Sequence, residues 1–218
     1  MRHIRKGKEP LALTRYRAAP GARYDGDSGF PVVKEAIREG LVHEQHALCC
    51  YCMQRIKPSD PHMRIEHRVP QSDPRGRDLD LDWRNLLGAC PGGEDSQDTH
   101  CDVAKGGTPI TLDPTESAHA ATLSFRAGRI QSSNRVFQVE IGDVLKLNCA
   151  QLVERREHAL DAYIRERTAG RMTGLRREVF ERWLRQIEDV PTGHPLPPFS
   201  ELLVSWLRKE IRRRSSKL

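Results

Sequence analysis

Apolar residues recur at helical spacing in two parts of the chain. From Pro31 onward they repeat at steps of three and four residues, which predicts a helix over residues 31–47. Beyond Asn134 nearly all of the sequence has this pattern, with a break at residues 191–199. Periodic apolar faces are the ordinary way in which helices pack, so we interpret these faces as core. The first 30 residues have no clean period and predict an irregular lead-in.

Short apolar runs predict a few β elements. Residues 53–69, with a turn at 58–61, predict a β-hairpin, and residues 122–125 predict a second hairpin because a turn containing Gly128 follows them. Residues 83–87 predict a short helix or turn, and residues 91–99 a loop. We therefore expect an α+β fold with a helical C-terminal lobe. The expected parts are a basic N-terminal arm (1–29), a core (30–110) and a mainly helical domain (111–218).

Basic residues exceed acidic ones by six, and 28 of the 36 are arginines. The planar guanidinium group suits phosphate, so an anionic polymer is a reasonable partner, although a GC-rich genome would also favour arginine codons. Residues 1–23 carry a net charge of +6 and residues 171–218 one of +5, whereas residues 66–102 carry −5. An acidic centre between basic ends suits a cation site flanked by phosphate-holding surfaces. Scattered solvated charges would explain the two ends equally well.

No stretch of 18 uncharged apolar residues occurs in the sequence, and no apolar segment follows the basic start. We therefore expect a cytoplasmic protein with no membrane partner.

Four cysteines have the spacing of a metal site. Cys49 and Cys52 form C-x-x-C, which lets one tight turn direct two thiolates at a single ion. Cys90 follows after 37 residues and Cys101 after another ten. Four thiolates would complete a closed tetrahedral site for structural zinc. A redox C-x-x-C expects a βαβ context that this sequence lacks, so we favour zinc.

The remaining cysteines have no place in this set. Cys50 is left over, and Cys149 is interpreted as a buried hydrophobic residue. His100 could replace one of the thiolates. Clustered cysteines in a chain without a secretion signal bind metal more often than they form disulfides, which again indicates the reducing cytoplasm.

An acid and a histidine, Glu66 and His67, lie side by side between the cysteine pairs. A hydrolytic nuclease needs a base that works near neutral pH and a hard cation that neutralises charge on phosphate. Imidazole meets the first need, and carboxylates bind Mg²⁺, so Glu66, His67 and Asp102 contain the required set. Neighbours on a regular strand face opposite sides, but Pro70 indicates a bend that brings both side chains to one pocket.

The order C-x-x-C, IEHRVPQS, WRNLLGAC and HCDVAKG resembles the ββα-metal motif of HNH endonucleases. This resemblance implies a zinc-stabilised ββα-metal nuclease core over residues 30–110. It implies that His67 is the general base and that Glu66 and Asp102 are ligands of a catalytic Mg²⁺ or Mn²⁺. Asn85 matches the position that supports the hairpin and the orientation of the histidine.

Two basic residues near this motif are candidates for nucleic-acid binding. Lys105 resembles a lysine commonly found just after the last motif position, and Arg68 follows the histidine. We expect both to contact nucleic acid.

Further stretches narrow the resemblance. MRHIRKGKEP, EQHALCCYC, RAGRI and DVLKLNCAQLVERR are similar to the retron-associated HNH endonucleases that include the PtuB subunit of Septu anti-phage systems. The similarity covers about residues 1–167. It implies a nuclease that cuts DNA by default, with RNA not excluded, and leaves 5′-phosphate and 3′-hydroxyl ends. It also implies a PtuA-like ATPase partner, sometimes alongside a retron reverse transcriptase complex.

The sequence departs from the family pattern in two ways. Ten residues separate Cys90 from Cys101 where the family usually has a compact C-x-x-C followed by Asn, and Glu66 and Asp102 replace the more usual Asp or His and Asn. A non-catalytic zinc-binding module that docks nucleic acid or an ATPase is the alternative. It would keep the cysteines but have no use for His67. A nuclease that is silent until its partner assembles is a third interpretation.

Overall fold

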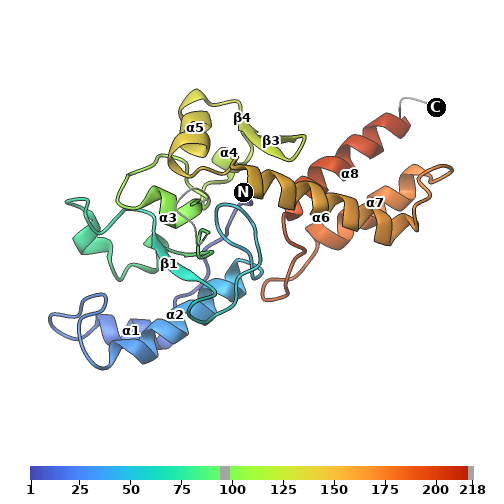
Figure 1. Ribbon diagram of the computed structural model, residues 1–218. Coiled ribbons are helices and arrows are strands. Elements are labelled where there is room, and N and C mark those ends of the chain that lie inside the picture. Colours follow the sequence, from blue (N-terminus) through green and yellow to red (C-terminus); the bar gives the residue numbers. More distant parts are fainter. Residues whose placement is uncertain (94–98, 216–218) are drawn as a thin grey trace.

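The computed structural model describes residues 1–93 and 99–215, which form helices and two small antiparallel sheets. The elements are, in chain order, α1 (Leu11–Arg17), α2 (Phe30–Glu44), β1 (Arg64–His67), η1 (Gly76–Leu79), η2 (Trp83–Asn85), β2 (Leu86–Ala89), α3 (Cys101–Lys105), α4 (Ser117–Ala120), β3 (Leu123–Arg126), β4 (Arg129–Ser132), α5 (Arg135–Val139), η3 (Glu140–Val144), α6 (Ala150–Thr168), α7 (Arg177–Glu188) and α8 (Ser200–Ser215) (Figure 1). The expected α+β class is confirmed. Every helix in the described part is too short or too polar to traverse a lipid bilayer.

The first sheet is an antiparallel pair of β1 and β2, with Glu66 opposite Leu87. The hairpin expected within residues 53–69 is therefore wrong, because β1 pairs with a strand that lies beyond the polar loop. The residues before β1 form a tight turn, closed by a single bridge between Leu48 and Arg55. Met53 in this turn has a φ of 66°, which a regular strand does not contain. Met53 therefore belongs to the C-x-x-C turn and not to a strand.

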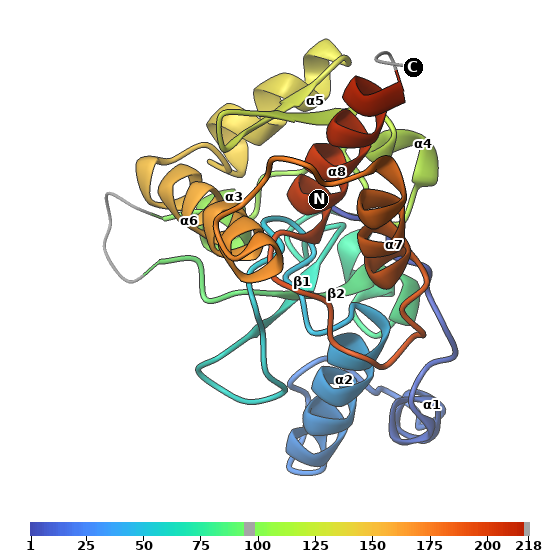
Figure 2. The same ribbon diagram turned by 90° about the vertical axis from the view of Figure 1, so that its right-hand side faces the viewer.

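The strand β2 begins where a short helix or turn was expected. The single 3₁₀ turn η2 is confirmed at residues 83–85, and it runs directly into β2, all four residues of which are buried. Of the predicted loop at residues 91–99, residues 94–98 lie outside the described part. Figure 2 shows β1 and β2 near the centre of the view, with α2 below them and α8 above.

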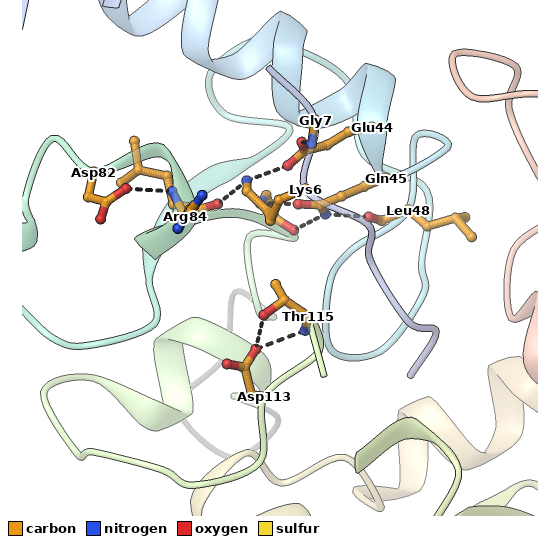
Figure 3. A network of polar contacts seen from close by, with 11 residues as sticks. Lys6, Gly7, Glu44, Gln45, Leu48, Asp82, Arg84, Asp113 and Thr115 are labelled. Carbon is orange, nitrogen blue, oxygen red and sulfur yellow. Dashed lines mark hydrogen bonds and ion pairs between the residues drawn. The ribbon is translucent and has the colours of Figure 1, made fainter. Parts of the chain in front are cut away.

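The N-terminal residues, expected to be an irregular lead-in, contain α1 and pack onto the core. Met1 and Ile4 are 2% and 5% exposed. Lys6 forms an ion pair with Glu44 of α2 and donates a hydrogen bond of 2.8 Å to the carbonyl of Leu86 in β2 (Figure 3). The N-terminal segment therefore fastens α2 to the first sheet.

The C-terminal part follows the expected pattern closely. The second hairpin is confirmed as β3 and β4, which pair with Phe125 opposite Ile130. The helices beyond residue 134 are confirmed, as is the break at residues 191–199 between α7 and α8. One hydrophobic cluster contains buried residues from Met1 to Leu152, and a second joins α6, α7 and α8. These three helices lie on the right in Figure 1, away from α1 and α2. The division at residue 110 stays a prediction.

Candidate metal centre and active site

Four cysteine side chains converge as their spacing predicts. The Sγ atoms of Cys49, Cys52, Cys90 and Cys101 all lie within 4.8 Å of one another, and all four residues are buried. The distance is 3.8 Å between Cys49 and Cys101 and 3.6 Å between Cys52 and Cys90. A tetrahedral site with Zn–S bonds of about 2.3 Å requires sulfur atoms about 3.8 Å apart. The donor set and its size therefore fit zinc.

Backbone hydrogen bonds explain why these cysteines meet. The N–H of Cys50 donates to the carbonyl of Gly88 at 2.9 Å, which attaches the C-x-x-C turn to β2. Cys90 follows β2 directly. Within the ten residues between Cys90 and Cys101, the N–H of His100 donates to the carbonyl of Gly92 at 2.8 Å, and the residue after His100 begins α3. The unusual spacing therefore still delivers the fourth sulfur atom.

The residues left over by the sequence pattern stay outside the four-sulfur group. Burial raises the pKa of Cys50 well above its ordinary value, so this thiol remains neutral. Nδ1 of His100 lies 3.2 Å from Sγ of Cys101, a contact with the cluster rather than a replacement for one of its members. Cys149, expected to be buried, is half-buried at the residue before α6.

The predicted catalytic residues line one pocket of about 420 Å³. Glu66 and His67 come from the end of β1, and Asp102 comes from the first turn of α3. The chain bends directly after β1, and Pro70 lines the same pocket. An imidazole and two carboxyl groups therefore share one cavity, although the first two belong to adjacent residues.

Glu66 is held at the floor of this pocket with 2% exposure. Its Oε1 accepts a hydrogen bond of 2.8 Å from the hydroxyl of Tyr51. The same oxygen forms an ion pair with Nζ of Lys105, also at 2.8 Å. The pKa of Glu66 is raised to about 8, mainly by burial and next by the hydrogen bond with Asp102, while Lys105 opposes the shift. Tyr51 is not among the residues predicted from the sequence, and its place inside the C-x-x-C turn is the one signal that could have identified it.

His67 is oriented by the loop between the two strands. Its Nε2 lies 3.0 Å from the carbonyl oxygen of Asp80. A carbonyl can only accept, so Nε2 carries the proton and Nδ1 of the neutral ring keeps its free lone pair. The ring of Tyr24 meets the imidazole edge-on at 4.6 Å between centroids. Burial lowers the pKa of His67, which favours the neutral ring near pH 7.

Asn85 lies outside the pocket and supports the loop that follows β1. Its Oδ1 accepts from the N–H of Val69 at 2.8 Å, and its Nδ2 donates to the carbonyls of Val69 (3.2 Å) and Leu79 (3.1 Å). Leu79 directly precedes the residue whose carbonyl meets His67. Asn85 therefore fixes both ends of the segment that orients the imidazole.

The two residues expected to contact nucleic acid have partners within the chain. Lys105 is 2% exposed, pairs with Glu66 and donates to the carbonyl of His67 at 3.3 Å. Arg68 pairs with Asp113 at 3.0 Å and keeps 35% of its side chain exposed. Lys105 can reach a ligand only inside the pocket, whereas Arg68 also faces solvent.

An exposed arginine covers the second carboxylate. Nε of Arg64 lies 2.5 Å from Oδ2 of Asp102, and the Arg64 side chain is 58% exposed. Both carboxyl groups of the pocket therefore have a cationic partner, one buried and one free to move into solvent.

Comparison with known proteins gives one informative similarity. No protein-family model matches the chain. The chain is 27% identical over 104 residues to the retron Ec83 "putative HNH endonuclease" of Escherichia coli, and the aligned region covers 45% of this chain and 40% of that protein. The chain thus spans less than half the length of this relative. The similarity supports an HNH-like nuclease and nothing finer.

Proposed function

We propose that the protein is a metal-dependent HNH endonuclease that hydrolyses phosphodiester bonds of nucleic acid, with DNA as the default substrate. The observation that carries this proposal is the meeting of His67, Glu66 and Asp102 in one pocket. Both acidic residues are linked to segments that supply the cysteines. Asp102 directly follows Cys101, and Tyr51 of the C-x-x-C turn donates a hydrogen bond to Glu66.

His67 is the general base of the proposed reaction. With Nε2 donating to the Asp80 carbonyl, Nδ1 is the atom that takes a proton from the attacking water. The lowered pKa of His67 keeps this nitrogen unprotonated at neutral pH. Asn85 acts through the loop and is a positioning residue.

Glu66 and Asp102 are the proposed ligands of a divalent cation. Asp102 raises the pKa of Glu66, a sign that two like charges would lie close together, and this repulsion is what a cation between them relieves. A bound Mg²⁺ or Mn²⁺ would supply Lewis-acid stabilisation of the charge on phosphate and on the leaving oxygen. Tyr51 and Lys105 orient Glu66 for this role.

The biological setting is proposed from the named relative. Its description as a retron protein supports a role of this chain in anti-phage defence. An ATPase partner of the PtuA kind, and in some systems a retron reverse transcriptase complex, belong to the same proposal, as does a PtuB-like identity.

The test is a cleavage assay with supercoiled plasmid and with single-stranded RNA, with Mg²⁺ or Mn²⁺ supplied or omitted. We expect cleavage only with added metal, and none by His67→Ala, which keeps full zinc content and an unchanged circular dichroism spectrum. His158→Ala is the matched control, because this histidine is 73% exposed on α6. Cleavage by His67→Ala would refute the assignment. Nucleic-acid binding without cleavage, also in the presence of the ATPase, would favour the non-catalytic module.

A further inference from the structure

A fully buried arginine lies near the cysteine cluster without a carboxylate partner. Arg156, in α6, has 0% exposure. Its Nη1 donates to the carbonyl oxygens of Leu147 at 2.7 Å and Gly128 at 3.2 Å. Its Nε and Nη2 atoms are buried and have no hydrogen-bond partner. Within residues 1–93 and 99–215, no Asp or Glu forms an ion pair with it.

Such an arginine needs a negative charge nearby. Arginine stays protonated in proteins, and removing an unpaired charge from water costs several kcal/mol. Backbone carbonyls satisfy one of its three nitrogens and provide no net charge.

Hydrogen bonds place Arg156 beside the cluster. Its partner Leu147 lies two residues after Leu145, whose carbonyl accepts the N–H of Cys101 at 2.9 Å. Its guanidinium group lies 5.9 Å from the ring of Phe199, whose N–H donates to the carbonyl of Met53, the residue after Cys52. Burial lowers the pKa of Arg156, and Cys52 and Cys101 oppose this shift, in agreement with their position.

The charge of the cluster depends on its metal. Four protonated thiols are neutral, whereas four thiolates around Zn²⁺ carry a net charge of −2. Beside four neutral thiols the positive charge of Arg156 has no counter-charge. Beside the zinc–thiolate cluster the net charge of −2 compensates it. We propose that Arg156 is the counter-ion of a zinc–thiolate cluster formed by Cys49, Cys52, Cys90 and Cys101. This inference rests on the zinc site of the proposed function but not on nuclease activity.

The position of Arg156 gives the pairing a structural consequence. Nη1 holds the carbonyl of Leu147, just before α6, and that of Gly128 in the turn between β3 and β4. Three separate pieces of the chain thus meet at one guanidinium group. Because the coupling is reciprocal, zinc binding stabilises the packing of α6, and the packed α6 raises the affinity for zinc.

The experiment compares zinc binding in four purified full-length proteins: wild type, Arg156→Gln, Arg156→Lys and Arg155→Gln. Gln removes the charge but keeps N–H donors for the two carbonyls, and Lys keeps the charge but loses the planar fork. Arg155 is exposed on the same helix, so its replacement removes an equal charge outside the core. Zinc dissociation constants are measured by competition with a chromogenic chelator, and unfolding of the zinc-loaded and zinc-free proteins by circular dichroism.

The expected result is a zinc dissociation constant raised about 10- to 100-fold in Arg156→Gln, the size typical for residues that support metal ligands. Arg156→Lys and Arg155→Gln should stay within a few fold of wild type. An arginine that only holds carbonyl groups would behave differently. Both Arg156 variants would then lose stability equally with and without zinc, and zinc affinity would be unchanged. That outcome overturns the proposal, as does loss of folding in both Arg156 variants.

Failure of the proposed function is separable from failure of this inference. If wild type binds no zinc, both the zinc site and the counter-ion role are refuted. If wild type binds zinc but no nucleic acid is ever cleaved, only the nuclease proposal fails. If zinc affinity does not change with the charge at position 156, only the counter-ion role is refuted.

Discussion

The raised pKa of the buried Glu66 predicts how stability depends on pH, and this prediction can be tested without a substrate. The folded-state pKa of Glu66 is about 8, against an ordinary value of 4.5. Between these values the folded protein binds a proton that the unfolded chain has released. The contribution of Glu66 to stability is therefore greatest at low pH and falls as the pH rises toward 8, the direction that linkage requires for a raised carboxyl pKa.

The size of this effect follows from the two pKa values. Linkage gives a loss of about 1.5 kcal/mol between pH 6.5 and pH 8 from this group alone. Two other groups act in the opposite direction in this range, because burial lowers the pKa of His67 and lowers that of the N-terminal amine to about 5. The Glu66 contribution is therefore the difference between wild type and a variant that lacks only this carboxyl group.

The assay is urea unfolding of the zinc-loaded protein at pH 6.5, 7.25 and 8 without added magnesium. Glu66→Gln replaces the protonated carboxyl group by an isosteric amide, so wild type should lose about 1.5 kcal/mol relative to this variant over the range. Glu39→Gln, at an exposed position of α2, should follow wild type. Parallel pH profiles for wild type and Glu66→Gln would refute the reasoning, since the carboxyl group would then be ionised throughout.

Three further predictions concern the pocket and its supports. Arg64→Ala should lower the Mg²⁺ concentration for half-maximal cleavage several-fold, because it releases Asp102 from its ion pair. Arg64→Lys should need the same Mg²⁺ concentration as wild type. An unchanged Mg²⁺ concentration for Arg64→Ala would contradict this prediction. Asn85→Ala should cost about 1–3 kcal/mol in urea unfolding, since buried backbone groups lose their partner; a loss below about 0.5 kcal/mol would show that the loop does not depend on it. At saturating Mg²⁺, which keeps the ligand Glu66 ionised, the acid limb of the pH–rate profile should lie below pH 6.5, as the lowered pKa of His67 requires, and a limb above pH 7 under this condition would exclude His67 as the base.

The parts of the fold with local signals were predictable from the sequence. α2 follows from apolar spacing after Pro31, and the β3–β4 hairpin follows from a turn with Gly128 at positive φ. The four-cysteine cluster was predictable because metal coordination constrains spacing and residue type more strongly than the intervening chain.

The wrong prediction, a β-hairpin within residues 53–69, concerns the pairing of strands that lie far apart in the sequence. β1 finds its partner beyond a polar loop, and a four-residue strand carries too little pattern to say which distant segment it joins. The same limit hid the hydroxyl of Tyr51, the carbonyl of Asp80 and the guanidinium of Arg156, because each acts on residues far away in the sequence. Residue type predicted that Glu66, His67 and Asp102 share one pocket, but not the contacts that hold them.

These contacts join the candidate zinc centre to the candidate active site. The C-x-x-C turn contains Tyr51, which holds Glu66, and Cys101 is followed at once by Asp102. The sheet partner of β1 ends at the residue before Cys90. Each segment that supplies a sulfur ligand therefore also positions one carboxyl group or the strand that carries His67. A metal at the sulfur atoms would thus fix the relative positions of the pocket's groups without touching any of them, and this connection explains how a loop-rich segment can hold the geometry of the pocket.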